Sequence, residues 1–64
     1  MQTGRVSIAR EVIRRRESVG LSQKALAAAA GIRVETLNRI EKAKVTADTA
    51  TISKIARAIE RAER

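Results

Sequence analysis

The chain has 64 residues, with fourteen lysines and arginines against seven aspartates and glutamates and a formal net charge of +7 at pH 7. It contains no cysteine and no histidine, which excludes a disulfide framework and a Cys/His zinc site. It also contains no aromatic residue, which removes the side chains on which single-stranded nucleic acids stack. The length and charge predict one small basic domain that attracts a polyanion, either a nucleic-acid duplex or an acidic membrane surface.

The composition favours helix throughout, because proline is absent and Ala, Arg, Glu, Lys, Leu and Ile dominate. A first helix is predicted from Ser7 to Val19, since Ile8 and Val12 lie close to one helical face. Gly20 supplies a stop at its C-terminus. Residues 1–6 are predicted to form a flexible N-terminus.

Two short helices are predicted on either side of Gly31. The first runs from Gln23 to Ala30, and Ser22 is a good N-cap for it. Gly31 fits the left-handed position that follows such a helix. The second of the pair spans Val34 to Ile40.

A fourth helix is predicted after a loop over residues 42–47. Asp48 is the expected N-cap, with Thr46 as the alternative. Residues 60–64 are charged all round and are expected to fray. The predicted apolar positions of this helix are Ile52, Ile55, Ala56 and Ile59.

The residues around Gly31 satisfy the constraints of a helix-turn-helix. Leu26 and Ile40 would close the core from the two short helices, and Ala27 must be small because the helices cross there. The second helix would then be presented outward. The alternative is an ordinary helical hairpin without a role in DNA binding. The positions that agree are Leu26, Ala27, Ala30, Gly31, Ile32, Leu37 and Ile40.

Three stretches of the sequence carry a family pattern: GLSQKALAAAAGI (Gly20–Ile32), TLNRIEKAK (Thr36–Lys44) and TISKIARAI (Thr51–Ile59). Together they resemble the Cro/C1-type helix-turn-helix family of phage repressors, Cro proteins and bacterial regulators. The resemblance implies a compact all-α, lambda-repressor-like DNA-binding domain of four helices, with or without a short fifth turn. This single domain would occupy residues 1–64, with the helix-turn-helix at residues 22–41.

Four positions depart from the family pattern. Arg33 stands where the family usually has Ser or Thr as N-cap, and Ala25 stands where Glu is usual. Ala43 and Ala47 replace the usual Gly and Pro, so we expect weakened caps and a more mobile loop before the fourth helix. The chain also stops where the family's fifth helix begins. The dimer contact is therefore expected to come from the fourth helix and the loop before it.

The resemblance implies that the third helix reads base edges through Val34, Glu35 and Arg39. Arg39 can form a bidentate pair with guanine, and Val34 can contact a thymine methyl group. Glu35 can accept a hydrogen bond from a cytosine amino group. The alternative for Glu35 is a carboxylate favoured by the helix dipole.

Contacts to the DNA backbone are expected at the ends of the two short helices. Gln23 lies at a helix N-terminus, where N–H groups bind phosphate, and the resemblance implies that it also braces the recognition helix. Arg10, Arg14 and Arg15 are weaker candidates, and Arg15 alternatively lays its stem over the core. The remaining backbone candidates are Lys24, Arg33, Thr36, Asn38, Lys42 and Lys44.

The resemblance also implies a structural pair between Arg16 and Glu41, which would join the first helix to the end of the third. No cofactor, metal or enzymatic activity is expected, because catalysis without His or Cys would need paired carboxylates and the acidic residues form no such constellation. A basic amphipathic membrane peptide is disfavoured by the glycine stops at Gly20 and Gly31.

The predicted function is sequence-specific binding of double-stranded DNA by a Cro-like transcriptional repressor. One recognition helix reads few base pairs, so we expect a homodimer on a palindromic operator, weakly associated off DNA. The alternative is an antitoxin or other protein-binding module built on the same fold. No apolar run approaches the roughly 20 residues of a membrane span. We therefore expect a cytoplasmic protein without a membrane partner, associated with the nucleoid when bound to DNA.

Overall fold

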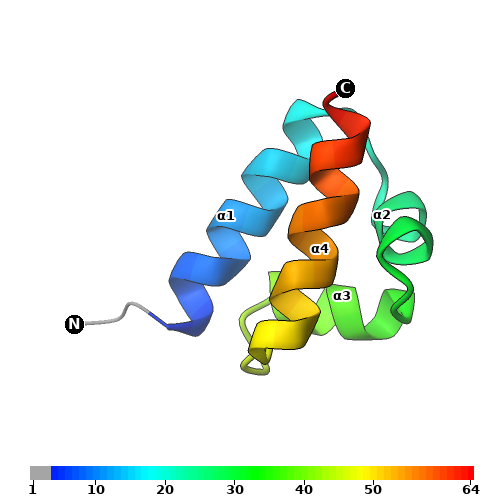
Figure 1. Cartoon of the computed structure of the whole chain (residues 1–64). Coiled ribbons are helices and arrows are strands. Elements are labelled where there is room, and N and C mark those ends of the chain that lie inside the picture. Colours follow the sequence, from blue (N-terminus) through cyan, green and yellow to red (C-terminus); the bar gives the residue numbers. More distant parts are fainter. Residues whose placement is uncertain (1–3) are drawn as a thin grey trace.

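Four α-helices follow one another in residues 4–64, the part of the chain that the computed structural model describes (Figure 1). They are α1 (Arg5–Ser18), α2 (Gln23–Ala30), α3 (Val34–Glu41) and α4 (Thr49–Ala62). The predicted all-α architecture is confirmed, and the predicted bounds of α2 agree with the structure at both ends. The longest helices have 14 residues, and none within residues 4–64 could cross a membrane.

Side-chain caps fix the starts of α2 and α4. The Ser22 hydroxyl accepts a hydrogen bond from the Ala25 N–H at 3.0 Å, and the Asp48 carboxylate accepts one from the Thr51 N–H at 2.8 Å. Each bond satisfies a backbone donor that the helix itself leaves free. Asp48, rather than the alternative Thr46, is the N-cap of α4. The hydrogen bond with Thr51 also lowers the pKa of the Asp48 carboxyl.

The first helix begins earlier than predicted, at Arg5 instead of Ser7. Its first turn is closed by the Ile8 N–H, which donates to the Gly4 carbonyl at 3.1 Å, and no side chain caps it. A helix start without a capping side chain leaves no local signal in the sequence. Arg5 and Val6, predicted within the flexible N-terminus, are thus helical, while residues 1–3 of that segment lie outside the described residues.

The ends of the other helices also differ slightly from the predictions. At α3 the helix includes Glu41, one residue beyond the predicted end. At α4 it continues through Ala62, into the segment expected to fray. Two departures from the family pattern are visible in the backbone. Arg33 is the N-cap of α3 and makes no capping hydrogen bond, and Ala43 has a φ of 59°, in the left-handed region that favours glycine.

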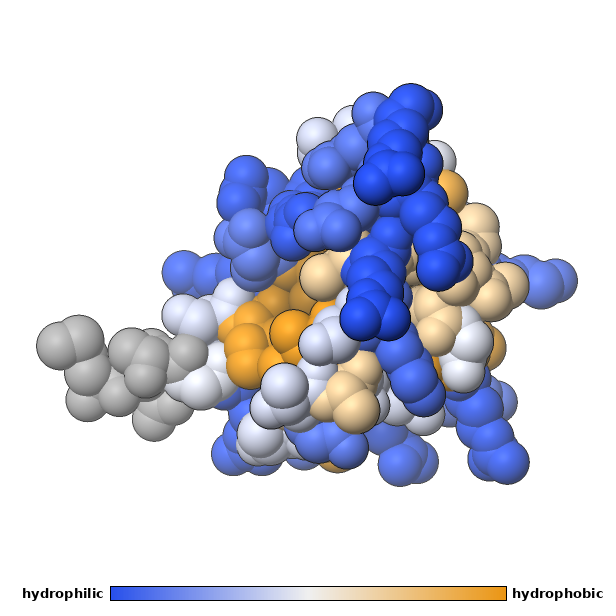
Figure 2. All heavy atoms as spheres, in the orientation of Figure 1, coloured by the Kyte–Doolittle hydropathy of each residue, from blue (hydrophilic) through white to orange (hydrophobic). Residues whose placement is uncertain are grey.

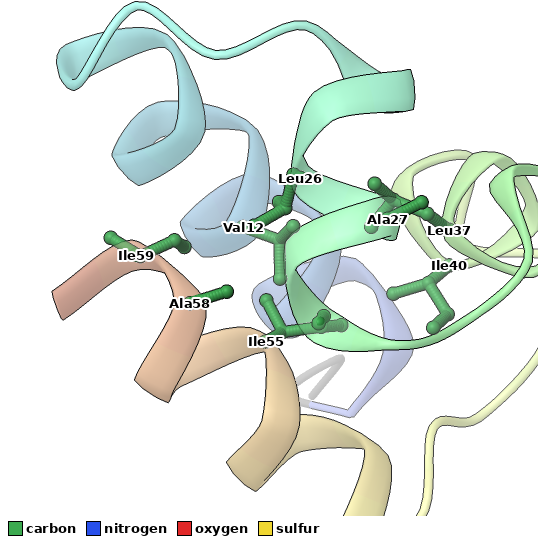
Figure 3. Packing of buried hydrophobic residues seen from close by; sticks show 9 residues of the cluster. Val12, Leu26, Ala27, Leu37, Ile40, Ile55, Ala58 and Ile59 are labelled. Carbon is green, nitrogen blue, oxygen red and sulfur yellow. The ribbon is translucent and has the colours of Figure 1, made fainter. Parts of the chain in front are cut away.

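The core lies where α2 packs against α3 and α4, and α1 packs against α3 (Figure 3). Leu26 and Leu37 are completely buried, and Ala27 is nearly so, as expected where two helices cross closely. One prediction for α4 is wrong in part: Ala58 is buried, whereas Ile52 and Ala56 are only half-buried. The buried apolar residues are Ala9, Val12, Leu26, Ala27, Ala30, Leu37, Ile40, Ile55, Ala58 and Ile59.

Candidate nucleic-acid interface

The turn between α2 and α3 determines how α3 is presented. Gly31 has φ 71° and ψ 33°, a left-handed conformation that side chains disfavour. Its N–H donates to the Ala28 carbonyl at 3.2 Å, and the Ile32 N–H donates to the Ala27 carbonyl at 3.0 Å. These bonds close α2, and the chain starts α3 three residues after the glycine, at Val34.

One side of α3 is buried and the other is exposed. Leu37 and Ile40 belong to the core, on the side that faces α1 and α2. Val34, Glu35 and Arg39 are exposed, and Val34 keeps 39% of its surface in solvent although it is a large aliphatic residue. The three residues predicted to read bases therefore lie together on the accessible side of the helix.

This accessible side and the start of α2 form a shallow hollow. It has a volume of about 380 Å³ and is lined by Gln23, Val34, Glu35, Asn38 and Arg39. The structure thus brings the three expected base readers next to two of the expected backbone contacts. A guanidinium, a carboxylate, amides and an aliphatic side chain are the groups that recognise base edges in the major groove of DNA.

Arg16 and Glu41 lie in contact, joining α1 to the end of α3. The Arg16 Nε donates to Glu41 Oε2 at 2.7 Å, and its Nη2 donates to Oε1 at 3.0 Å. The third nitrogen, Nη1, donates to the Leu21 carbonyl at 2.9 Å. Glu41 is the one charged residue that is buried within residues 4–64. The hydrogen bond to Glu41 raises the pKa of Arg16, and the bidentate geometry joins α1 to the end of α3.

Gln23 links this ion pair to the exposed side of α3. Its Nε2 donates to Glu41 Oε1 at 2.8 Å, and its Oε1 accepts from Asn38 Nδ2 at 3.3 Å. The side chain of Gln23 therefore spans from the start of α2 to two positions of α3. Asn38, expected only to contact the DNA backbone, is half-buried and turned toward Gln23. The resemblance implied that Gln23 braces this helix, but no local pattern indicated Asn38 as its partner, because the two residues lie fifteen positions apart.

Exposed cations lie at the ends of the two short helices. Lys24 is in the first turn of α2, Arg33 precedes α3, and Lys42 and Lys44 follow it. None of the four belongs to the two ion pairs found within residues 4–64. The first N–H groups of α2 also point outward from the helix, as they do at sites that bind phosphate. This arrangement produces a positive potential beside the hollow.

The weaker candidates on α1 lie elsewhere. Arg14 is paired with Glu11 at 2.7 Å, and the hydrogen bond from Arg14 lowers the pKa of the Glu11 carboxyl. Arg15 lines a second depression, between α1 and α4, and Arg10 is exposed. None of the three arginines lines the hollow at α3.

Two further residues, Thr36 and Arg5, do not line the hollow at α3. Thr36, also expected at the DNA backbone, is half-buried and does not line the hollow. Arg5 makes a contact that no sequence pattern predicted: its Nη1 donates to the Lys44 carbonyl at 3.3 Å. This bond ties the start of α1 to the loop before α4 across 39 positions of sequence, a distance at which no local pattern gives a signal.

A comparison with protein families finds one described as "Helix-turn-helix" that matches residues 12–63 of this chain. The match covers most of the chain and includes all three stretches that carry the resemblance, which it confirms. Comparison with curated proteins and with solved structures finds no match.

Proposed function

We propose, on the premise that this chain belongs to the Cro/C1-type helix-turn-helix family, that it is a repressor-type transcriptional regulator that reads operator DNA as a homodimer. The family is one of non-enzymatic DNA-binding domains, so DNA is a partner of this chain. The observation that carries the finer proposal is the hollow at α3. Its lining combines charged, amide and aliphatic groups on an accessible helix face.

In the proposed complex, α3 enters the major groove of DNA. Arg39 forms a bidentate hydrogen bond with guanine, and Val34 contacts a thymine methyl group. Glu35 accepts a hydrogen bond from a cytosine amino group, and its negative charge disfavours positions where a phosphate would approach. The exposure of these three side chains supports this role.

Phosphate contacts hold α3 in register along the groove. The N-terminus of α2 faces one strand, and Gln23 orients the start of α2 because its amide is held between Glu41 and Asn38. The unpaired cations Lys24 and Arg33 lie close by in sequence and add attraction to the backbone. Lys42 and Lys44 contact phosphates beyond the other end of α3.

A single α3 contacts too few base pairs to define a unique site, so two copies bind a palindromic operator. Their recognition helices enter successive major grooves about 34 Å apart. The two copies associate weakly in the absence of DNA.

The proposal is tested by selecting bound duplexes from a random library. We expect a palindromic site whose half-sites repeat at about one helical turn. Arg39→Ala should relax preference at one base position per half-site, at a cost of about 1–3 kcal/mol for the preferred base. Arg10→Ala, which removes an exposed arginine outside the hollow, is the matched control and should leave the selected site unchanged. A site without symmetry would contradict the homodimer, and equal weakening of all sequences by Arg39→Ala would assign Arg39 to the backbone.

A further inference from the structure

A groove lies between α1 and α4, on the side of the molecule that faces the viewer in Figures 1 and 2. Its free volume is about 120 Å³. Figure 2 shows apolar surface, in orange, between the two helices, with hydrophilic side chains, in blue, above it and side chains of intermediate hydropathy, in white, below it. Ile8, Glu11, Val12 and Arg15 line the groove from α1, and Ile52 and Ala56 line it from α4 above a floor that includes Ile55.

The groove is open because α1 and α4 contact one another less extensively than α2 contacts α4 or than α1 and α2 contact α3. Its lining residues lie three or four positions apart along each helix, so each helix contributes one continuous stripe. Ile8, Ile52 and Ala56 are only half-buried and remain accessible from solvent. An apolar cavity of about 150 Å³ takes up benzene, so the groove has room for one side chain of about the size of leucine.

The charges beside the groove favour an anionic partner. Both oxygens of the Glu11 carboxylate accept hydrogen bonds from Arg14, each at 2.7 Å. Arg15, on the same edge, is in neither of the two ion pairs within residues 4–64. The groove therefore presents one available cation, on a chain whose net charge is +7. Such a surface attracts an acidic partner.

We propose that the groove between α1 and α4 binds an acidic amphipathic helix of a partner protein. One apolar side chain of that helix enters the groove, the apolar side chains one turn before and after it lie along the groove, and one of its carboxylates pairs with Arg15. Helices bind grooves in this way through anchors at i, i+3 or i+4, and i+7. The groove shares no residue with the hollow at α3, so the partner helix and DNA use different surfaces of the domain.

The probe is a synthetic helical peptide with leucines at i, i+3 and i+7 and glutamates beside them, titrated into the ¹⁵N-labelled full chain. Amide shifts should concentrate on the groove residues of α1 and α4. Ala56→Leu fills the groove and should weaken binding about tenfold or more. Arg15→Gln should weaken it about two- to fivefold, as expected for an ion pair at the surface that includes a half-buried arginine. Arg10→Gln removes an exposed arginine outside the groove and should leave the affinity unchanged.

Several results would overturn the proposal. The first is that the peptide does not bind the folded chain. The second is that the amide shifts are confined to the hollow at α3, because an acidic peptide bound there would only imitate DNA. Equal binding of a peptide with lysines in place of the glutamates would remove the role of Arg15. Concentration-dependent shifts at the groove without peptide would assign it to a second copy of the chain. If Ala56→Leu does not fold, Arg15→Gln and the lysine peptide still decide the question. Binding of DNA by the same variants is measured separately.

Discussion

At the scale of single residues, Glu41 is where the fold and the proposed DNA-binding surface meet. Its buried carboxylate accepts hydrogen bonds from Arg16 of α1 and from Gln23 of α2. A desolvated charge is tolerated only when it is paired and hydrogen-bonded. Changes at Glu41 should therefore affect both the stability of the domain and the orientation of Gln23.

Glu41→Ala leaves the Arg16 guanidinium in a largely buried place without its partner, and we expect the free energy of unfolding to fall by about 3 kcal/mol. The double change Arg16→Met with Glu41→Leu removes both charges and should recover much of that loss. Urea unfolding of Arg16→Met, of Glu41→Leu and of the double variant measures this coupling. Glu11→Ala, which breaks the exposed pair with Arg14, is the control and should change stability little. Strictly additive losses at Arg16 and Glu41 would show that the pair is not a unit.

Ala43 is a second residue at which a single substitution should change stability, because its Cβ strains the backbone. With a φ of 59°, its Cβ lies in a conformation that disfavours side chains by about 1–2 kcal/mol. Ala43→Gly should relieve this strain and, after the extra entropy of the unfolded glycine chain, raise the free energy of unfolding by about 0.5–1 kcal/mol. Ala28→Gly in the exposed middle of α2 is the matched control and should lower it by about 1 kcal/mol. Thermal and urea unfolding distinguish the gain in stability expected for Ala43→Gly from the loss expected for Ala28→Gly. A loss of stability in both variants would show that Ala43 is not strained.

At the scale of the elements, capping side chains set where α2 and α4 begin, whereas α1 begins without one. The stability of α4 should depend on pH, because its capping side chain, Asp48, is an ionised carboxylate. The hydrogen bond with Thr51 lowers the pKa of Asp48 in the folded chain. A carboxyl with a lowered folded pKa contributes stability above its unfolded pKa, and this contribution is lost as the pH falls through the folded pKa.

The melting temperature of the unmodified chain should therefore fall as the pH decreases from neutral to below the ordinary aspartate value of 3.8. Asp48→Asn keeps a good N-cap but removes the titrating group, so its melting temperature should fall less over the same range. Glu11 also has a lowered pKa and contributes to both curves, which is why the difference between the two proteins is the quantity measured. Parallel curves would show that the charge of Asp48 has no part in stabilising α4.

At the scale of the whole molecule, the net charge of +7 should dominate the affinity for DNA. The logarithm of the binding constant should fall with the logarithm of the salt concentration, by about 0.9 per neutralised phosphate. Lys44→Ala should weaken binding to all duplexes alike and flatten this slope by about one unit. Lys54→Ala, which removes an exposed lysine of α4 outside the hollow, is the control and should leave the slope unchanged. Fluorescence anisotropy at several salt concentrations measures both, and an affinity independent of salt would contradict the proposed phosphate contacts.

The proposed homodimer makes a separate prediction at this scale. The two recognition helices must lie on the same face of the duplex, so their separation is fixed by the helical repeat of DNA. Insertion of about five base pairs between half-sites turns one of them to the opposite face and should abolish cooperative binding. Insertion of about ten should restore the alignment. Gel-shift titrations of the three operators report cooperativity directly, and equal cooperativity on all three would exclude a rigid symmetric pair.

Local patterns in the sequence were sufficient for the features that depend on neighbours within one helical turn. The bounds of α2, the turn at Gly31 and the cap at Asp48 were predicted because a cap, a left-handed glycine and a helical stripe each act over three or four residues. The resemblance to a family supplied the outward positions of Val34, Glu35 and Arg39, which lie opposite the buried Leu37 and Ile40 on α3. For Arg16 and Glu41, the resemblance to a family supplied the pairing.

Other features depended on how the helices pack, and only the tertiary structure decided them. The bond from Asn38 to Gln23 and the bond from Arg5 to Lys44 join residues 15 and 39 positions apart. Ala58 is buried because α4 lies closely against α2, while Ile52 and Ala56 remain half-buried because α1 meets α4 over only a short stretch. The groove on that side has the same cause. Helical periodicity specifies which residues share a face of a helix, but the depth to which that face is buried depends on the angle and distance at which the next helix packs.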